Sequence, residues 1–435
     1  MKLTRAIISV AMALMMLCVG CKDAESENVN SNTTSSEDGG FVSSQPDDEN
    51  EVETMKPFEV YPAYETEYED TYTKVKTLTE AGNFTCIMLT DTHIDYIKKL
   101  AEGEDWYKGK QGDYYVERYL IEREIEHVIE LANTSGVDCV VLGGDLIHGT
   151  SSYESSINDL KYFASIFSEK CNVPVYVNRG NHDTNDYHNL QDGKCYVGNI
   201  INQEEWVDIL VDPLSKNTAV HPDYDPKSTY YYVDFEDKKT RLIVLDNYNY
   251  PVMGDNNGFA VWRAETWTGM EQEQLLWLAK TALDKEKDGW SFILSSHAPL
   301  VGTESFKGSD KVRTIVEAFN NRESIAVEGV LIDYSDVEST YIPLSVSGHT
   351  HIGSTRFFKE ADHIAINTGS GKISYYPQRV YTDSENQINF HEKRYEGEAT
   401  EAKFDIVSLG ADGTVTRISF GFGIDESYEK KDYCN

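Results

Sequence analysis

Basic residues are scarce in this sequence of 435 residues, and their scarcity excludes several kinds of partner. Lysine and arginine together number 39 against 74 aspartates and glutamates, which gives a formal net charge of −35 at pH 7. A surface this acidic repels nucleic acid and anionic membranes, and none of the basic runs that such binding requires is present. We therefore expect no nucleic-acid binding through surface charge.

Cysteine spacings typical of metal sites or disulfide frameworks are also absent. Of the seven cysteines, Cys18 and Cys21 lie at the N-terminus, and no C-x-x-C follows them. The other five are an odd number for a disulfide framework, so we expect at most one or two bridges. Cys86, Cys139 and Cys171 lie in or just before apolar strand-like runs, which favours small buried hydrophobic residues over reactive thiols.

The apolar stretch at the N-terminus is too short to span a bilayer as a helix. Two basic residues precede the apolar run 6–17, which is the pattern of a secretory signal over residues 1–21. The run ends in a sequence that resembles a bacterial lipobox, in which Cys21 would be lipidated, although Cys18 occupies the place of the usual leucine. We expect an extracytoplasmic protein that reaches the cell membrane only through this N-terminal lipid anchor. Plain secretion after cleavage of an ordinary signal is the alternative.

Residues 22–75 are expected to form an acidic, disordered tether ahead of a catalytic domain at 76–435. Ser, Asn, Thr, Asp and Glu dominate this segment, which cannot bury enough apolar surface to fold. The tyrosine-containing stretch 61–68 could instead pack along the domain, and the sequence leaves both possibilities open. No internal repeat or obvious break divides the domain, which ends in a C-terminal β extension.

Short apolar runs typical of buried strands alternate with helical patterns from residue 83 onward. Within 116–132, apolar residues 121, 125, 128 and 132 recur at helical spacing and share one face. Strands that alternate with helices through short connections indicate a layered α/β core with helices covering a largely buried sheet. Further helices are expected near 157–167, 275–283 and 312–319, and strands at 83–90, 137–142, the start of 173–183, 230–236, 240–246, 291–295, 342–346, 364–366, 404–409 and 414–420.

Several of these strands end in side chains able to perform chemistry, which is how open α/β sheets build sites. Any one of these residues taken alone could be structural, but their repetition at strand ends favours a single site. The candidates are Asp91, His93, Asp145, Asn181, His182, His297, His349 and His351.

The donor types indicate a metal centre. Carboxylate, imidazole and amide donors suit Zn, Mn or Fe rather than metals bound by thiolates. Asp91 and His93 are two residues apart, so in an extended segment both side chains would point the same way, and His349 and His351 repeat this spacing. With one residue set aside for catalysis, seven ligands are too many for one tetrahedral ion and suit two ions that share a carboxylate.

These residues form five ordered blocks that resemble the calcineurin-like metallophosphoesterase family over residues 84–351. The resemblance implies an α/β fold, a four-layer α-β-β-α sandwich with mixed sheets, and a dinuclear metal site. The blocks are Asp91-x-His93, Gly144-Asp145, Gly180-Asn181-His182-Asp183, His297 and Gly348-His349-x-His351.

The resemblance also implies roles for individual residues. One divalent ion would be held by Asp91, His93, Asp145 and His351, and the other by Asp145, Asn181, His297 and His349. Two such ions, of Mn, Zn or Fe, can bridge a hydroxide and hold phosphate oxygens during in-line attack. His182 would lie beside the phosphate and protonate the leaving group.

Three residues near the blocks depart from the family pattern or leave its roles open. His148 stands where similar protein phosphatases carry the aspartate that orients the catalytic histidine, so the partner of His182 is not apparent. His148 could support another residue, contact substrate or simply belong to the loop. Asp183 is expected to orient a ligand or cap the turn. Arg179 could reach the substrate phosphate, although an arginine at a strand end more often forms a surface ion pair.

The sequence therefore predicts a metal-dependent hydrolase of phosphomonoesters or phosphodiesters. The alternative is a cell-surface binding protein that uses the same scaffold without turnover. The complete set of candidate ligands and the presence of His182 favour the enzyme.

Overall fold

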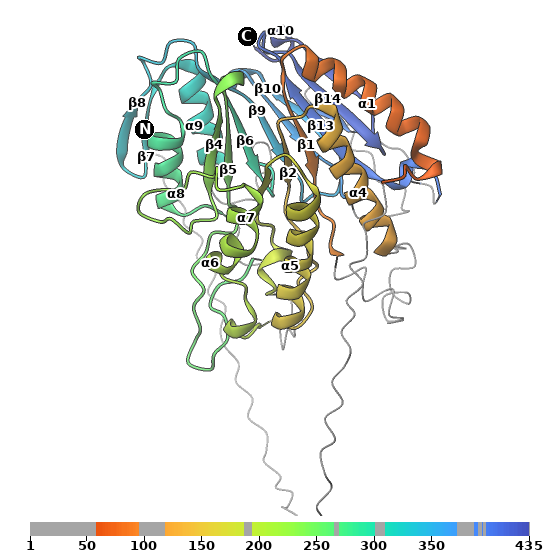
Figure 1. Ribbon diagram of the computed structural model, residues 1–435. Coiled ribbons are helices and arrows are strands. Elements are labelled where there is room, and N and C mark those ends of the chain that lie inside the picture. The colour runs from red at the N-terminus through yellow and green to blue at the C-terminus, as the bar shows by residue number, and fades with distance from the viewer. Residues whose placement is uncertain are drawn as a thin grey trace, which may run out of the picture. The chain divides into compact units, whose positions relative to one another are not determined.

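Two β-sheets face each other in the computed structural model, and helices cover both outer faces (Figure 1). The structure describes residues 58–94, 118–186, 194–264, 269–300, 309–371, 387–389, 394 and 397–434. The expected signal at 1–21, Cys21 and residues 22–57 of the expected tether lie outside these residues. Residues Pro57–Asn435 form one compact unit.

The first sheet has six strands in the order β15-β14-β13-β1-β2-β3. Its three N-terminal strands run parallel to one another, whereas β13 pairs antiparallel with β1 and brings the C-terminal extension beside the start of the domain. The strands are β1 (Phe84–Leu89), β2 (Cys139–Leu142), β3 (Val175–Val177), β13 (Lys403–Leu409), β14 (Val415–Gly421) and β15 (Glu426–Tyr428).

The second sheet has seven strands in the order β12-β10-β11-β9-β6-β5-β4. Its centre, β5, β6, β9 and β11, is parallel, and antiparallel strands close both edges. A separate hairpin pairs β7 (Ser324–Val327) with β8 (Val330–Asp333). The other strands are β4 (Tyr231–Phe235), β5 (Thr240–Leu245), β6 (Ser291–Ser296), β9 (Tyr341–Ser347), β10 (Ser354–Phe358), β11 (His363–Asn367) and β12 (Gln387–Asn389).

Alternation along the strands divides the interior into two apolar layers. In β5, Leu242 and Val244 join the core between the sheets, whereas Ile243 and Leu245 join the core beneath the outer helices. Because successive strand residues point to opposite faces, one apolar strand serves both layers. This pattern explains why the central strands are continuous hydrophobic runs in the sequence.

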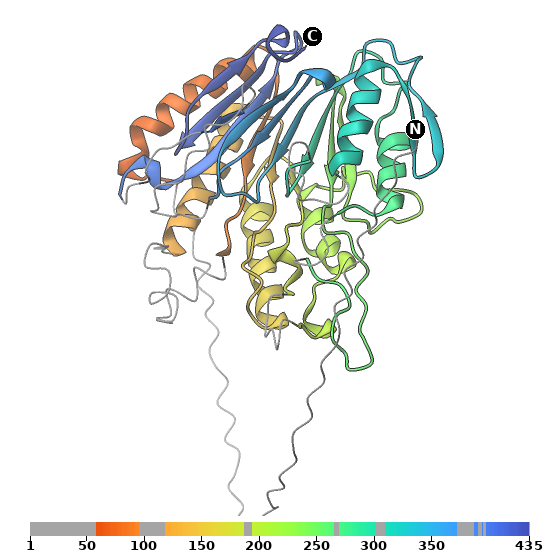
Figure 2. The same ribbon diagram turned by 180° about the vertical axis from the view of Figure 1, so that it is seen from behind.

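Helices complete the outer layers. Helices α1 and α4 lie side by side against the first sheet, and α8 and α9 lie over the second, as both views show (Figures 1 and 2). The predicted four-layer α-β-β-α sandwich is confirmed.

No helix among the described residues is both long and apolar enough to cross a membrane. The helices are α1 (Glu65–Glu80), α4 (Arg118–Ser135), α5 (Tyr153–Lys170), α6 (Gln203–Trp206), α7 (Asp212–Leu214), α8 (Gln272–Trp277), α9 (Ser309–Asn321) and α10 (Lys430–Tyr433). Two π-helical segments are η4 (Val207–Val211) and η6 (Leu278–Ala282), and the 3-10 turns are η1 (Pro62–Tyr64), η2 (His182–Thr184), η3 (Val197–Asn199), η5 (Glu236–Lys238), η7 (Lys359–Ala361) and η8 (Ala399–Glu401).

The boundary that the sequence placed between tether and domain at residue 75 is wrong. Helix α1 and the turn η1 before it belong to the folded unit: Tyr64 of η1 and Val75 of α1 are fully buried, and the Tyr64 hydroxyl donates a 2.7 Å hydrogen bond to Glu401 in η8. The acidic composition reflects the outer face of the helix alone. The domain therefore includes the tyrosine-containing stretch and begins at or before Phe58.

We expect a chain that starts at residue 76 to be much less stable than one that starts at residue 58. The shorter chain loses Tyr64, Tyr68 and Val75 from the core, and burial of each side chain of this size contributes roughly 1.5–3 kcal/mol. Urea unfolding followed by circular dichroism should show a loss of several kcal/mol. Equal midpoints for the two chains would contradict the assignment of α1 to the folded unit.

All five cysteines in the described part of the chain are free thiols, and four of them are buried. Burial raises the pKa of the Cys171 and Cys195 thiols, so both stay protonated. Cysteine here acts as a small apolar residue, in agreement with the strand positions of Cys86 and Cys139.

Candidate metal centre

Carboxylates and imidazoles meet where the parallel strands of both sheets end. Parallel strands place their carboxyl ends at one edge, and the loops that follow them form the crevice. After β1 come Asp91 and His93, after β2 Asp145, after β3 Asn181 and His182, after β6 His297, and after β9 His349 and His351.

One group of donors consists of Asp91, His93, Asp145 and His351, whose ligand atoms lie within 4.8 Å of one another. His351 Nε2 is 3.2 Å from Asp91 Oδ1 and 3.4 Å from His93 Nε2. Although Asp91 Oδ1 is buried, it accepts no hydrogen bond within the described structure. Because a buried carboxylate oxygen without a donor is costly, these atoms fit a cation between them.

A second group consists of Asp145, His297 and His349. His297 Nε2 lies 3.2 Å from Asp145 Oδ2 and 3.1 Å from His349 Nδ1. The same Asp145 oxygen lies 3.8 Å from His93 Nε2 in the first group. Asp145 Oδ2 therefore faces both groups, while its Oδ1 accepts a 2.8 Å hydrogen bond from the backbone N–H of His182.

The charges of this centre are coupled. Burial alone would raise the pKa of the Asp145 carboxyl, but the nearby His297 and His182 hold it well below its usual range. Burial would lower the pKa of His297, but the Asp145 carboxylate raises it to about 9. Burial, together with the neighbouring His297, lowers the pKa of His349 to about 4. The carboxylates are thus ionised at neutral pH, and the site favours positive charge between its two groups.

The backbone at the candidate ligands is left-handed, which the sequence did not predict. The φ angles are 57° at Asp91, 46° at His93, 52° at Asp145, 69° at His349 and 60° at His351. The expectation of an extended Asp-x-His segment is therefore wrong, because β1 ends at Leu89 and a left-handed turn aims both side chains. Left-handed backbone costs about 1–3 kcal/mol per non-glycine residue and is concentrated at functional sites.

Two glycines in the sequence blocks allow backbone to approach the ligands. A Cβ at Gly180 would lie 2.2 Å from Asp145 Oδ1, and a Cβ at Gly348 would lie 2.6 Å from Asp91 Oδ2. Both distances are far below van der Waals contact. The glycines are thus required because any side chain would displace a carboxylate.

We expect Gly180→Ala to lower metal affinity about 10–100-fold, the usual effect of disturbing a ligand's support. The added methyl group would push Asp145 out of line with both groups of donors. Gly198→Ala is the matched control, since a Cβ there meets nothing within 4 Å. Competition with a chelating metal indicator measures the affinity. Equal affinities for the two variants would contradict this role of Gly180.

The backbone carbonyl of His148 is a hydrogen-bond partner of the His182 ring. The Nδ1–H of His182 donates a 2.6 Å hydrogen bond to the His148 carbonyl oxygen, and the two rings stack with centroids 4.9 Å apart. Nδ1 of His148 also lies 3.1 Å from Nδ1 of His93. His148 therefore orients both His182 and His93, and a carbonyl replaces the aspartate whose absence left the partner of His182 open.

Asp183 supports the loop that carries Asp145. Its carboxylate accepts hydrogen bonds from the backbone N–H groups of Asp145, Leu146, Ile147 and Gly180, at 2.8–3.2 Å. These bonds join the loops after β2 and β3. Of the two roles expected for Asp183, orientation of a ligand fits the structure.

Arg179 does not face the centre. It is buried, and its guanidinium lies 2.9 Å from Asp246 Oδ2 and donates a 2.7 Å hydrogen bond to the Tyr248 carbonyl. The suggestion that Arg179 reaches the substrate phosphate is therefore wrong. Both partners of the guanidinium lie in the loop after β5, so Arg179 holds this loop in place.

Sequence reasoning missed the loops after β5 and β11. The Tyr248 ring lies with its centroid 6.0 Å from that of His297 and 6.4 Å from that of His349. Ser370 donates a 2.9 Å hydrogen bond to the carbonyl oxygen of Asp91. The only available signal was the position of these residues after a buried strand, because neither carries a metal-binding side chain.

Comparisons with known proteins agree with this arrangement. A family model described as calcineurin-like phosphoesterase matches residues 84–353. No curated protein matches the chain. Similar solved structures include a dimetal phosphatase from Danio rerio, with 14% identity, a TM-score of 0.51 and coverage of 80% of this chain and 99% of that one.

Two further similar structures are GAP50, described as the anchor in the inner membrane complex of Plasmodium, and PhoD. GAP50 has 12% identity and a TM-score of 0.43, covering 80% of this chain and 88% of that one. PhoD has 11% identity and a TM-score of 0.40, covering 80% of this chain and 68% of that one. At these identities the likeness concerns the fold alone.

Proposed function

The chain belongs to the calcineurin-like phosphoesterase family, and from this premise we propose that it hydrolyses phosphoesters at a dinuclear metal centre. The observation that carries the proposal is that Asp145 belongs to both groups of candidate ligands. Its Oδ2 lies 3.8 Å from His93 Nε2 in one group of donors and 3.2 Å from His297 Nε2 in the other, so this carboxylate could serve both ions.

The donor groups assign ligands to each ion. Asp91, His93, Asp145 and His351 would hold the first, and Asp145, Asn181, His297 and His349 the second. Asn181 is buried beside His182, directly after the glycine that approaches Asp145. When bound, two divalent ions of Mn, Zn or Fe would supply Lewis acidity and an activated water for attack on phosphorus.

The protein's own residues complete the chemistry. Because Nδ1 of His182 is engaged by the His148 carbonyl, Nε2 is the atom that can deliver a proton to the departing alkoxide. Asp183 fixes the loop of Asp145 through backbone N–H groups, which keeps the bridging carboxylate in place.

The test uses the full chain, stripped of metal and reloaded with Mn²⁺ or Zn²⁺. We expect two ions per chain and saturable hydrolysis of an aryl phosphate monoester or diester. Absence of metal uptake would contradict the proposal. A loaded protein that binds inorganic phosphate but hydrolyses neither ester would support the alternative, a binding protein at the cell surface.

We also propose that Cys21 carries a lipid and anchors the protein outside the cytoplasm. The support is the signal-like segment 1–21 and its lipobox-like end. Incorporation of labelled palmitate should be lost in Cys21→Ser. Equal labelling of both proteins would contradict the anchor.

A further inference from the structure

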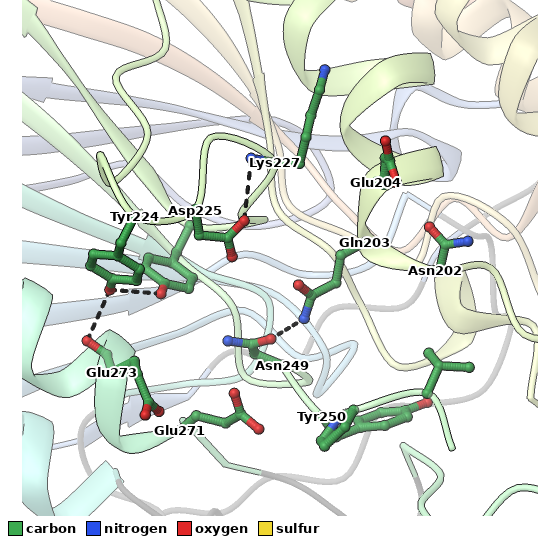
Figure 3. A pocket seen from close by; sticks show the side chains of 13 residues that line it. Asn202, Gln203, Glu204, Tyr224, Asp225, Lys227, Asn249, Tyr250, Glu271 and Glu273 are labelled. Atoms are coloured by element: carbon green, nitrogen blue, oxygen red, sulfur yellow. Dashed lines mark hydrogen bonds between the residues drawn. The ribbon is translucent and has the colours of Figure 1, made fainter. Parts of the chain in front are cut away.

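A pocket of about 590 Å³ lies beside the loop after β5. Its walls come from α6, the segment before β4, the loop after β5 and the start of α8 (Figure 3). The residues that matter for its chemistry are Glu204, Tyr224, Asp225, Tyr230, Asn249, Glu271 and Glu273.

The pocket is lined mainly by acidic side chains, and no cation among the described residues is directed into it. It is lined by four carboxylates and one lysine. The Nζ of Lys227 forms ion pairs with Asp208 and Asp212, at 2.5 and 2.7 Å, and Figure 3 shows it pointing away from Glu271 and Glu273. Within the described residues, the Glu271 side chain has neither a hydrogen bond nor an ion pair, and burial followed by repulsion from Glu273 raises its pKa.

Aromatic rings form one wall. Tyr230 is buried, packs edge-on against Trp277 with centroids 5.0 Å apart, and shares a 2.9 Å hydroxyl–hydroxyl hydrogen bond with Tyr224. Tyrosine faces beside uncompensated carboxylates form the environment that binds alkylammonium groups. A neutral or anionic ligand would leave these carboxylates without a counter-charge.

A buried amide also points into the pocket. Asn249 is only 5% exposed, and its Oδ1 accepts a hydrogen bond from Gln203. Its Nδ2 has no partner among the described residues, and Figure 3 shows this atom turned toward the side where Tyr224 and Glu271 lie. The pocket therefore offers a hydrogen-bond donor next to its carboxylates. This combination fits an alkylammonium group that carries an ester oxygen nearby.

The pocket and the metal centre share one short segment of the chain. Tyr248 packs against His297 and His349, and the next two residues, Asn249 and Tyr250, line the pocket. Consecutive residues of the loop after β5 therefore contact the imidazoles of the metal centre and form a wall of the pocket.

We propose that this pocket binds an alkylammonium group of the substrate, so that the preferred phosphoesters are zwitterionic. The inference builds on the proposed phosphoesterase function and adds the class of substrate. Glu271 is the specificity-determining residue, because its carboxylate faces the pocket without a partner of its own.

Direct binding tests the pocket without requiring turnover. Choline and its uncharged isostere 3,3-dimethylbutanol are titrated into the metal-loaded full chain by calorimetry. We expect choline to bind about tenfold more tightly, the size of a desolvated cation–aromatic contact. Glu271→Gln should remove this difference, whereas Glu236→Gln, on an exposed turn, should retain it. Equal binding of both ligands, or no binding of choline, would overturn the proposal.

Hydrolysis then separates the two proposals. Wild type should cleave p-nitrophenyl phosphorylcholine with a kcat/KM about tenfold above that for p-nitrophenyl 3,3-dimethylbutyl phosphate. In Glu271→Gln the ratio should fall to about one, with the rate on the 3,3-dimethylbutyl diester unchanged. Hydrolysis of both esters at equal rates in wild type would overturn the specificity alone, whereas choline binding without any hydrolysis would contradict the phosphoesterase function alone.

A displacement assay distinguishes the two sources of such a group. Displacement of choline by phosphatidylcholine vesicles would identify a lipid headgroup as the source, and displacement only by glycerophosphocholine would identify a soluble ester.

Discussion

Asp145→Asn should abolish phosphoester hydrolysis and leave the chain unable to hold two ions. Asp145 Oδ2 lies near His93 of one group of donors and near His297 of the other. An asparagine would place either a neutral oxygen or an N–H₂ group between the two cations, and the latter repels them. Disturbing a residue that only supports a ligand already costs 10–100-fold in affinity, so we expect a loss of more than about 100-fold here. Metal analysis after gel filtration and the rate on an aryl phosphate measure the two effects.

The matched control is Asp237→Asn, which makes the same chemical change on the exposed turn between β4 and β5. It should retain both ions and full activity. An Asp145→Asn protein with two tightly bound ions would show that the carboxylate does not bridge them. An Asp145→Asn protein with one bound ion and partial activity would show that one ion, held by a single group of donors, is sufficient for hydrolysis.

The layered core could be predicted because its strands are buried on both sides. Runs such as residues 84–89 and 139–142 carry apolar residues at nearly every position, and this pattern has few other interpretations. Helix α1 was missed for the opposite reason. Tyr64, Tyr68 and Val75 are its main core contacts, and the acidic residues between them resemble a disordered tether. Their spacing of four and seven residues was the signal of a helix.

The candidate site could be predicted as a set of residues but not as a geometry. Side chains that follow parallel strands must meet at one edge, so the positions of Asp145, His297 and His349 were sufficient to bring them together. The left-handed backbone at Asp91 and His93 depends on tertiary contacts that no local pattern records. The ion pair between Arg179 and Asp246 could not be predicted either, because these two residues come together only when both sheets have formed.

His182→Ala should lower kcat by about 10²–10⁴-fold on alkyl phosphoesters, the usual contribution of a positioned general acid. The reason is that an alkoxide leaving group needs a proton, and Nε2 of His182 is the atom held in position to give it. On p-nitrophenyl esters the loss should be much smaller, since p-nitrophenolate leaves without protonation. Metal content should not change, because the bond from residue 182 to Asp145 comes from the backbone N–H and survives the substitution.

The leaving-group comparison distinguishes an acid from a ligand. His182 lies within 4.8 Å of ring nitrogens of His93 and His148, so this trio could also hold a metal ion. If His182 were a ligand, His182→Ala would lose metal and slow every ester equally, whatever the leaving group. If it is the acid, the slope of log kcat against leaving-group pKa should become steeper in the variant while two ions remain bound. The carbonyl of His148 then does for His182 what an aspartate does in similar phosphatases: it accepts the Nδ1–H and so fixes the tautomer and the orientation of the ring.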